Sequence, residues 1–131
     1  MNDSVKVLVA DNSTEFGKVC KQIFVNLGIE VILSAKDGVK VIEVKKKKKP
    51  DVVLLDMFMQ GIDAIEVMER VNTESSMRPQ FIVMSSVDNS FFEMESLQKG
   101  ASYYILKPFD MHVLANRIKQ LAGAKDTVKA T

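Results

Sequence analysis

Five short apolar runs alternate with five segments of helical periodicity, and this alternation constrains the fold more than any other feature of the chain. The first run is Val5–Ala10, and apolar residues at spacings of three and four then continue from Phe16 to Leu27. The later runs come at residues 30–34, 51–56, 81–85 and 103–106. Strands this apolar need helices on both faces, so the repeat predicts a doubly wound α/β fold around a five-stranded parallel sheet.

The length of the chain predicts one domain, which we place at residues 4–122 of 131. Periodicity is lost after Gly123, so residues 123–131 are expected to be a disordered tail or the start of a linker. The only cysteine, Cys20, excludes an intrachain disulfide and suits a reducing cytoplasm. No apolar run approaches the ~20 residues that cross a bilayer, and no signal peptide is visible. A net charge of +1 gives no global attraction to nucleic acid, so we expect a cytoplasmic protein without membrane contacts.

Polar residues directly follow four of the five predicted strands. Asp11 and Asn12 follow the first, Asp56 ends the third, Ser85 ends the fourth and Lys107 follows the fifth. The carboxyl ends of parallel strands share one edge of the sheet, where ligands bind in such folds. In a sheet of order 2-1-3-4-5, the flavodoxin-like order, the second strand lies at the margin and the other four bring these side chains together.

The residues expected at this edge have the chemistry of phosphoryl transfer. A carboxylate can attack a phosphoryl group and form an aspartyl-phosphate, which makes Asp56 the candidate nucleophile. Asp11, Asn12 and Asp56 offer hard oxygen ligands, which favour Mg²⁺ over zinc. The Lys107 ammonium can neutralise charge on the transferred group, and the Ser85 hydroxyl can donate a hydrogen bond to one of its oxygens.

Simpler structural interpretations exist for some of these residues. Asn12 followed by Glu15 matches a capping box for the first helix. Asp11 alone can belong to a turn, and Ser85 alone can be structural. Asp56 differs from them, because an acid that ends a buried strand cannot cap a helix that begins several residues later. The joint position at four strand ends favours the functional interpretation.

Four segments resemble the receiver domains of two-component response regulators. They are Val-Leu-Val-Ala-Asp11-Asn12, Leu-Leu-Asp56-Met-Phe-Met59, Ile-Val-Met-Ser85-Ser86 and Tyr104-Ile-Leu-Lys107-Pro108-Phe109. The resemblance extends over about residues 4–122 and implies the five-stranded flavodoxin-like fold of receivers. It also implies a bistable domain that a local change of charge can switch.

The resemblance assigns a role to each residue of the predicted site. Asp56 is the implied phosphoacceptor, and Ser85 and Lys107 are the implied contacts to the phosphoryl group. The implied ligands of Mg²⁺ are Asp11, Asn12, Asp56 and the main-chain carbonyl of Phe58. Tyr104 matches an aromatic switch position, whose ring moves inward when the hydroxyl is drawn toward the phosphate.

The chain departs from the family pattern mainly at the metal ligands. The usual acidic pair after the first strand is Asp11-Asn12 here, so the second position carries an amide and the site loses a negative charge. A unit charge at ~4 Å is worth at most about 4 kcal/mol at an effective dielectric constant of about 20, so weaker Mg²⁺ binding and slower phosphorylation are expected. Gln60 replaces the usual proline and frees the backbone of the loop after Asp56. Ser85 replaces the usual threonine but keeps the hydroxyl.

The resemblance also implies partners. We expect a signalling switch that takes its phosphoryl group from a histidine kinase or a phosphotransfer protein, and not an enzyme with an external substrate. The run Gly100–Met111 is most similar to receivers of the stage zero sporulation protein A type, in which a DNA-binding domain follows the receiver. DNA binding is therefore expected only through a downstream domain outside this chain. Phe91, Phe92 and Met94 mark a candidate homodimer surface. It is the face formed by the helix predicted at residues 90–99, the strand at residues 103–106 and the last predicted helix, which carries Leu114, Ile118 and Leu121.

Two classes of alternative compete with the phosphorylation switch. A pseudo-receiver that binds partners without phosphorylation is expected if Asn12 and Gln60 disable the metal site. Enzymes of the same architecture fit poorly. A flavin mononucleotide site of the flavodoxin type needs a glycine-containing phosphate loop, and Asp11–Glu15 has no glycine. A haloacid-dehalogenase phosphatase needs a second aspartate two residues after its nucleophile, where Ser13 and Phe58 stand.

Overall fold

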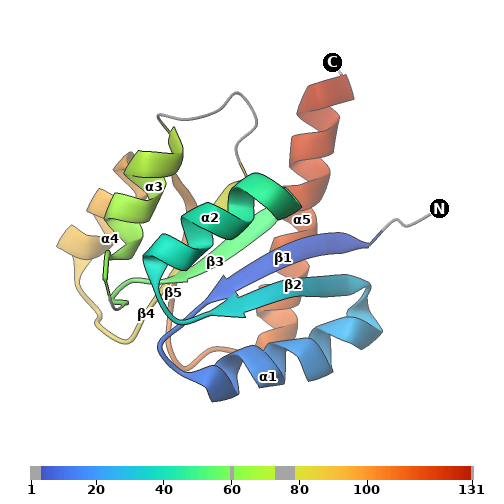
Figure 1. Ribbon diagram of the computed structural model, residues 1–131, viewed down its shortest axis with the longest axis horizontal. Coiled ribbons are helices and arrows are strands. Elements are labelled where there is room, and N and C mark those ends of the chain that lie inside the picture. Colours follow the sequence, from blue (N-terminus) through green and yellow to red (C-terminus); the bar gives the residue numbers. More distant parts are fainter. Residues whose placement is uncertain (1–3, 60, 73–78, 131) are drawn as a thin grey trace.

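The computed structural model describes residues 4–59, 61–72 and 79–130, which form one five-stranded parallel sheet flanked by helices (Figure 1). The strands are β1 (Val5–Ala10), β2 (Ile29–Ala35), β3 (Val52–Asp56), β4 (Gln80–Ser85) and β5 (Ala101–Leu106). Their order is β2-β1-β3-β4-β5, and every neighbouring pair is parallel. The predicted fold class and strand order are confirmed.

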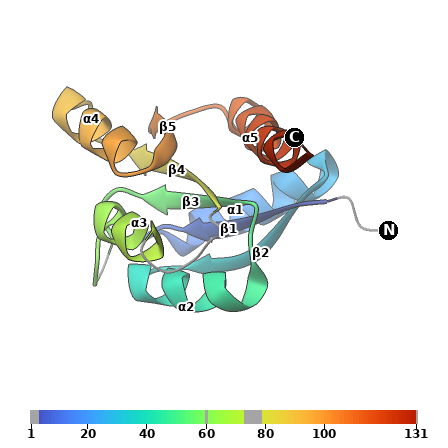
Figure 2. The same ribbon diagram turned by 90° about the horizontal axis from the view of Figure 1, so that it is seen from above.

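Helices cover both faces of the sheet. They are α1 (Thr14–Phe24), which continues into the 3₁₀ turn η1 (Val25–Leu27), α2 (Gly38–Lys48), α3 (Ala64–Asn72), α4 (Ser90–Gln98) and α5 (Met111–Ala130). The sheet separates α1 and α5 from α2 and α3, and α4 packs beside β5 (Figure 2). In the part of the chain that the structure describes, no helix combines the length and the apolar character needed to span a bilayer.

The central strands are buried because their sequences are apolar without interruption. Val7–Ala10 of β1 and Val52–Leu55 of β3 are fully buried. Alternate side chains point to opposite faces, so Leu8 joins the core under α2 and α3 while Val9 joins the core under α1 and α5. Asp11 and Asp56 stand where these apolar runs stop, which places both carboxylates at the carboxyl edge of the sheet.

Two element boundaries differ from the sequence prediction by two residues or more. Strand β5 begins at Ala101, earlier than the predicted start at Tyr103, because Ala101 already pairs with Phe81 of β4. Helix α5 continues to Ala130, whereas the loss of apolar periodicity predicted a tail or a linker from residue 123. A glycine inside a helix costs only about 1 kcal/mol relative to alanine, so Gly123 does not end the helix. The domain boundary at residue 122 stays a prediction.

The loop that follows Asp56 is held between α2 and α3. A Cβ atom on Gly38 would lie 2.6 Å from Cγ1 of Ile62 and 2.7 Å from its carbonyl oxygen, so only glycine lets α2 begin this close to the loop. At the other end of the loop, Asp63 Oδ1 accepts a 2.9 Å hydrogen bond from the backbone N–H of Glu66 and caps α3. Gln60, which was expected to loosen this loop, lies outside the described residues.

Candidate functional site

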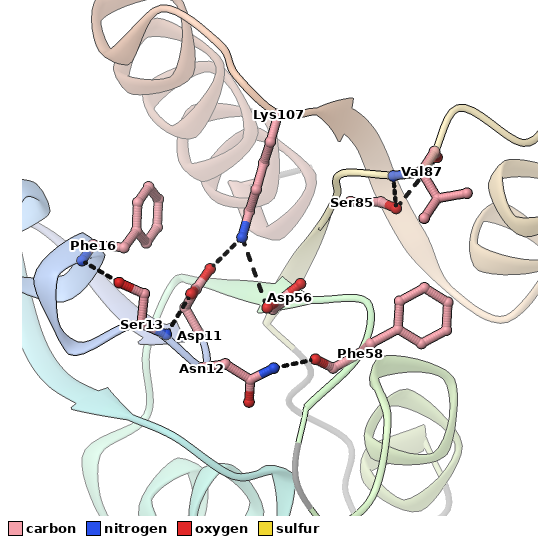
Figure 3. Close-up of polar contacts among 9 residues, drawn as sticks. All are labelled: Asp11, Asn12, Ser13, Phe16, Asp56, Phe58, Ser85, Val87 and Lys107. Atoms are coloured by element: carbon pink, nitrogen blue, oxygen red, sulfur yellow. Dashed lines mark hydrogen bonds and ion pairs between the residues drawn. The ribbon is translucent and has the colours of Figure 1, made fainter.

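Three charged side chains meet at the carboxyl edge of the sheet, as their positions at strand ends predicted (Figure 3). Lys107 Nζ lies 2.7 Å from Asp11 Oδ2 and 3.7 Å from Asp56 Oδ2. The three residues come from different strands, since Asp11 follows β1, Asp56 ends β3 and Lys107 follows β5. One ammonium group faces two carboxylates, so one negative charge at this edge has no counterion among these three groups.

Backbone hydrogen bonds fix the main chain at each of these positions. Asp11 N donates to Ala35 O at 3.0 Å, and Lys107 N donates to Ser85 O at 2.8 Å. The Asp11 side chain is buried, and its Oδ1 atom accepts a 2.8 Å hydrogen bond from Ser13 N. Both oxygens of Asp11 are therefore engaged, one with the start of α1 and one with Lys107.

The Asp56 carboxylate is partly shielded from water but remains accessible, with its side chain 13% exposed. Desolvation by burial raises the pKa of Asp56 above its ordinary value, and the charge of Asp11 raises it further. The charge of Lys107 and hydrogen bonds from the backbone N–H groups of Asn12 and Phe58 lower the pKa, but burial is the largest of these effects. The ionised side chain is therefore poorly solvated, and a cation placed beside it would stabilise it.

Asn12 crosses the edge of the sheet instead of capping α1. Ser13 is the N-cap, because its Oγ atom accepts a 3.3 Å hydrogen bond from Phe16 N, so the capping interpretation of Asn12 is wrong. Asn12 Nδ2 donates to the carbonyl oxygen of Phe58 at 2.5 Å. The backbone has not yet entered the helix at Asn12, which leaves its side chain free to reach the β3–α3 loop. Two of the predicted metal ligands are thus bonded to each other.

The predicted ligands of Mg²⁺ match the ion in chemical kind. Asp11, Asp56, the Asn12 amide and the Phe58 carbonyl supply hard oxygen atoms at one edge of the sheet. Within the described residues no three histidine, cysteine or acidic side chains gather into a metal-binding cluster, in keeping with an amide at Asn12. The donor set fits Mg²⁺ on one condition: the Asn12 amide, which presents its NH₂ group to the Phe58 carbonyl, must turn before its oxygen can serve as a ligand.

Ser85 and Tyr104 donate to the same acceptor in the β4–α4 loop. The buried Ser85 Oγ donates to Val87 O at 3.3 Å and accepts from Val87 N at 3.0 Å. The Tyr104 hydroxyl also donates to Val87 O, at 3.3 Å. Ser85 therefore points toward this loop and not toward Asp56 (Figure 3). Val87 was not a candidate in the sequence, where it is one of many apolar residues.

Two aromatic residues beside Lys107 were also missed from the sequence. The ring centroid of Phe16, in the first turn of α1, lies 5.7 Å from Lys107 Nζ. Phe109 meets the Phe16 ring edge to face, with the ring centroids 6.0 Å apart. Both rings line a surface hollow that includes Asp11 and Lys107. In the sequence Phe16 is only one member of the apolar stripe of α1, and nothing in that stripe shows which residue meets a distant lysine.

Comparisons with known proteins agree with this fold. Residues 7–119 match the family model of the response regulator receiver domain. The signal receiver domain of NarL from Mycobacterium tuberculosis is 26% identical, with a TM-score of 0.84 over 92% of this chain and 97% of that one. The receiver domain of the Francisella response regulator 1452 is 26% identical, with a TM-score of 0.86 over 93% and 99% of the two chains. The BeF3-activated N-terminal receiver domain of RstA from Klebsiella pneumoniae is 26% identical, with a TM-score of 0.81 over 89% and 97%. The chain therefore belongs to the family of response regulator receiver domains.

Proposed function

We propose that this receiver domain is a phosphorylation switch, which accepts a phosphoryl group on Asp56 from a histidine kinase or a phosphotransfer protein in the cytoplasm. The observation that carries the proposal is the position of the Lys107 ammonium, within 3.7 Å of the Asp56 carboxylate and 2.7 Å of Asp11. A phosphoryl group on Asp56 would bring its oxygens beside this fixed positive charge, which stabilises the transferring group.

The reaction transfers a phosphoryl group from a phosphohistidine to a carboxylate. An Asp56 oxygen attacks phosphorus, and an O–P bond forms as the N–P bond of the donor breaks. The imidazole of the donor leaves with the electron pair of the broken bond. Lys107 neutralises part of the charge on the phosphoryl oxygens throughout the transfer. The domain modifies its own side chain and turns over no external substrate, so we do not class it as an enzyme.

Asp11, Asn12, Asp56 and the main-chain carbonyl of Phe58 would hold Mg²⁺, which supplies positive charge to phosphoryl oxygens when bound. Asn12 could ligate only through its amide oxygen, because an NH₂ group has no free acceptor site. Turning the amide would break its hydrogen bond to Phe58. We therefore propose that this receiver binds Mg²⁺ more weakly than a receiver with a second acid at this position.

Ser85 and Tyr104 would supply the conformational response. To donate a hydrogen bond to a phosphoryl oxygen, the Ser85 hydroxyl must give up the hydrogen bond that it donates to Val87 O. The Val87 carbonyl would still accept the hydrogen bond from the Tyr104 hydroxyl, so the Tyr104 ring and the β4–α4 loop could move together. This rearrangement would convert a local change of charge into a change of surface shape.

The surface that responds would be the α4–β5–α5 face, which would bind a second copy of the chain. Phe91 and Met94 on α4 are 65% and 59% exposed, and apolar side chains this exposed gain free energy when another surface covers them. Phe92 packs edge to face against Phe58, with centroids 5.4 Å apart, and so connects this helix to the phosphoacceptor loop. Sedimentation with and without beryllofluoride would detect such a homodimer.

The output is proposed to be that of a sporulation-type transcriptional regulator. The support for this is the similarity of the run Gly100–Met111 to receivers of the stage zero sporulation protein A type. In such a regulator a separate downstream domain would contact DNA, while the receiver would only report phosphorylation.

A binding module that works without phosphorylation is the second candidate. The observation that favours it is the Asn12–Phe58 hydrogen bond, in which Asn12 presents its NH₂ group, which cannot ligate a metal ion, to the Phe58 carbonyl. In this case the same surfaces would engage partners constitutively.

Incubation with acetyl phosphate and Mg²⁺, followed by intact-protein mass spectrometry, separates the two candidates. We expect a mass gain of one phosphoryl group, which Asp56→Asn abolishes. Asp63→Asn is the matched control, because Asp63 caps α3 and asparagine is an equally good cap. A gain that survives in Asp56→Asn would assign the phosphoryl group to another residue. No gain even at high Mg²⁺ would favour the phosphorylation-independent module.

A further inference from the structure

We infer that Phe16 is a positioning residue for Lys107 in the phosphoryl transfer proposed above, and the inference rests on that function. The ring of Phe16, held in place by Phe109, supports the Lys107 ammonium from the side of α1. This support keeps the ammonium at the edge of the sheet while its anionic partners change.

Lys107 needs such support because its partners differ before and after transfer. A lysine side chain is a flexible four-carbon stem, and this one is 28% exposed, so solvent can compete for its ammonium. In the resting site the ammonium is held by Asp11 at 2.7 Å and lies 3.7 Å from Asp56. Once Asp56 carries a phosphoryl group, the ammonium must turn to the new oxygens and loosen its contact with Asp11.

An aromatic ring suits this task because it attracts a cation without fixing it to one acceptor. A cation within about 6 Å of a ring centroid is attracted to the face of the ring, and the distance from Lys107 Nζ to Phe16 is 5.7 Å. The ring does not compete with a carboxylate or a phosphoryl oxygen for the donors of the ammonium. Its attraction therefore persists whichever anion Lys107 contacts.

The surrounding structure fixes the ring itself. Phe16 lies in the first turn of α1, where its backbone N–H donates to the capping hydroxyl of Ser13. The Phe109 ring stands at 89° to the Phe16 ring, in the edge-to-face arrangement that aromatic pairs prefer. Phe109 is two residues beyond Lys107, so the aromatic pair joins the segment that carries the lysine to the helix that supports it.

The test compares Phe16→Leu, which keeps apolar bulk but loses the ring, with Phe16→Tyr, which keeps the ring. We expect Phe16→Leu to slow phosphorylation by acetyl phosphate about two- to fivefold, the effect of a partly exposed cation–π contact, and Phe16→Tyr to stay near the wild-type rate. Tyr103→Leu is the matched control, because Tyr103 lies 4.5 Å from the Arg117 guanidinium in a separate cation–π contact. If the leucine variant does not fold, Phe16→Met takes its place.

A second readout does not depend on phosphorylation. The Lys107 ε-methylene signals in a ¹H–¹³C NMR spectrum should carry the ring-current shift of Phe16, which is lost in Phe16→Leu and kept in Phe16→Tyr. A wild-type rate in Phe16→Leu, an equal loss in Phe16→Tyr, or unchanged Lys107 signals in Phe16→Leu would each overturn the inference. If the wild-type protein accepts no phosphoryl group, the proposed function fails, while the NMR comparison still decides whether Phe16 positions Lys107.

Discussion

The two sides of the carboxyl edge are organised in different ways. On one side Lys107 lies between Asp11 and Asp56, at 2.7 Å and 3.7 Å, and the ring of Phe16 flanks it. On the other side the neutral amide of Asn12 donates to the carbonyl of Phe58 at 2.5 Å. The lysine side is arranged for an anion before any ligand binds. On the asparagine side the amide NH₂ group is engaged, and Asn12 would have to turn before its oxygen could ligate a metal ion.

The reason for the difference is charge. A second carboxylate at position 12 would repel Asp11 and Asp56 unless a cation bound among them, and its oxygens could not donate to a carbonyl. An amide is neutral and carries both a donor and an acceptor, so other groups of the protein can meet its hydrogen-bonding needs without a cation. The residue at position 12 thus determines whether this side of the site needs a bound cation to offset charge repulsion or is stable without one.

Removing Lys107 should have the largest effect on the function of the site. We expect Lys107→Ala to slow phosphorylation by acetyl phosphate about 100-fold, the usual cost of losing one preorganised contact to a developing anion. Stopped-flow or mass-spectrometric rates would measure it. Lys99→Ala is the control, because Lys99 forms an exposed ion pair with Glu69 at 3.3 Å outside the site. A loss of phosphorylation rate in Lys107→Ala no larger than in Lys99→Ala would show that Lys107 takes no part in the reaction.

Restoring an acid on the other side should strengthen metal binding. We expect Asn12→Asp to raise the affinity for Mg²⁺ about tenfold, or about 1.4 kcal/mol, well below the ~4 kcal/mol upper bound for a unit charge at ~4 Å. Isothermal titration calorimetry with MgCl₂ measures this directly. Asn89→Asp adds the same charge at the N-cap of α4 and should leave the affinity unchanged. Equal affinities for Asn12→Asp and the wild-type protein would mean that the amide does not limit metal binding.

The buried charge on Asp56 should cost stability at neutral pH. Folding raises the pKa of Asp56 above its ordinary value of 3.8, mainly by burial, so the native state binds the proton more tightly than the unfolded state. Its contribution to stability is fully present below pH 3.8 and is lost as the pH rises through the raised pKa.

Asp56→Asn should therefore raise the melting temperature at pH 7 by a few degrees, the shift that about 1 kcal/mol produces in a domain of this size. The gain should shrink at pH 3, where the native carboxyl is already protonated. Thermal melts of both proteins at the two pH values test this. A lower melting temperature for Asp56→Asn than for the wild-type protein at pH 7 would contradict the expected direction of the change in stability.

The smallest effect is expected for the reactivity of Cys20, a buried residue of α1. Burial raises the pKa of the Cys20 thiol to about 12, and the charge of Asp11 adds to the shift. We expect no reaction with a thiol reagent at pH 8 in the native protein, and full reaction in urea. Asp11→Asn should leave the native thiol unreactive, because burial is the larger cause. Native labelling at the rate of a free thiol would show that α1 opens readily.

The sequence predicted the fold because local patterns suffice for it. Uninterrupted apolar strands between amphipathic helices require a covered parallel sheet, and polar residues at the ends of those strands must reach one edge. Asp11, Asp56 and Lys107 were therefore expected to meet, and they do. At Asn12 the sequence left two interpretations open, a helix cap or a side chain at this edge, and the structure excludes the cap, because Ser13 caps α1 and Asn12 contacts a residue 46 positions away.

What the sequence by itself determined is the parallel sheet and the set of charged residues at its edge, because periodicity and strand ends are local properties. What only the tertiary structure decided is which partner each side chain takes. Asn12 bonds to Phe58, Ser85 shares the Val87 carbonyl with Tyr104, and Phe16 supports Lys107. These contacts depend on how the β3–α3, β4–α4 and β5–α5 loops approach one another in space, and no spacing along the chain encodes that approach.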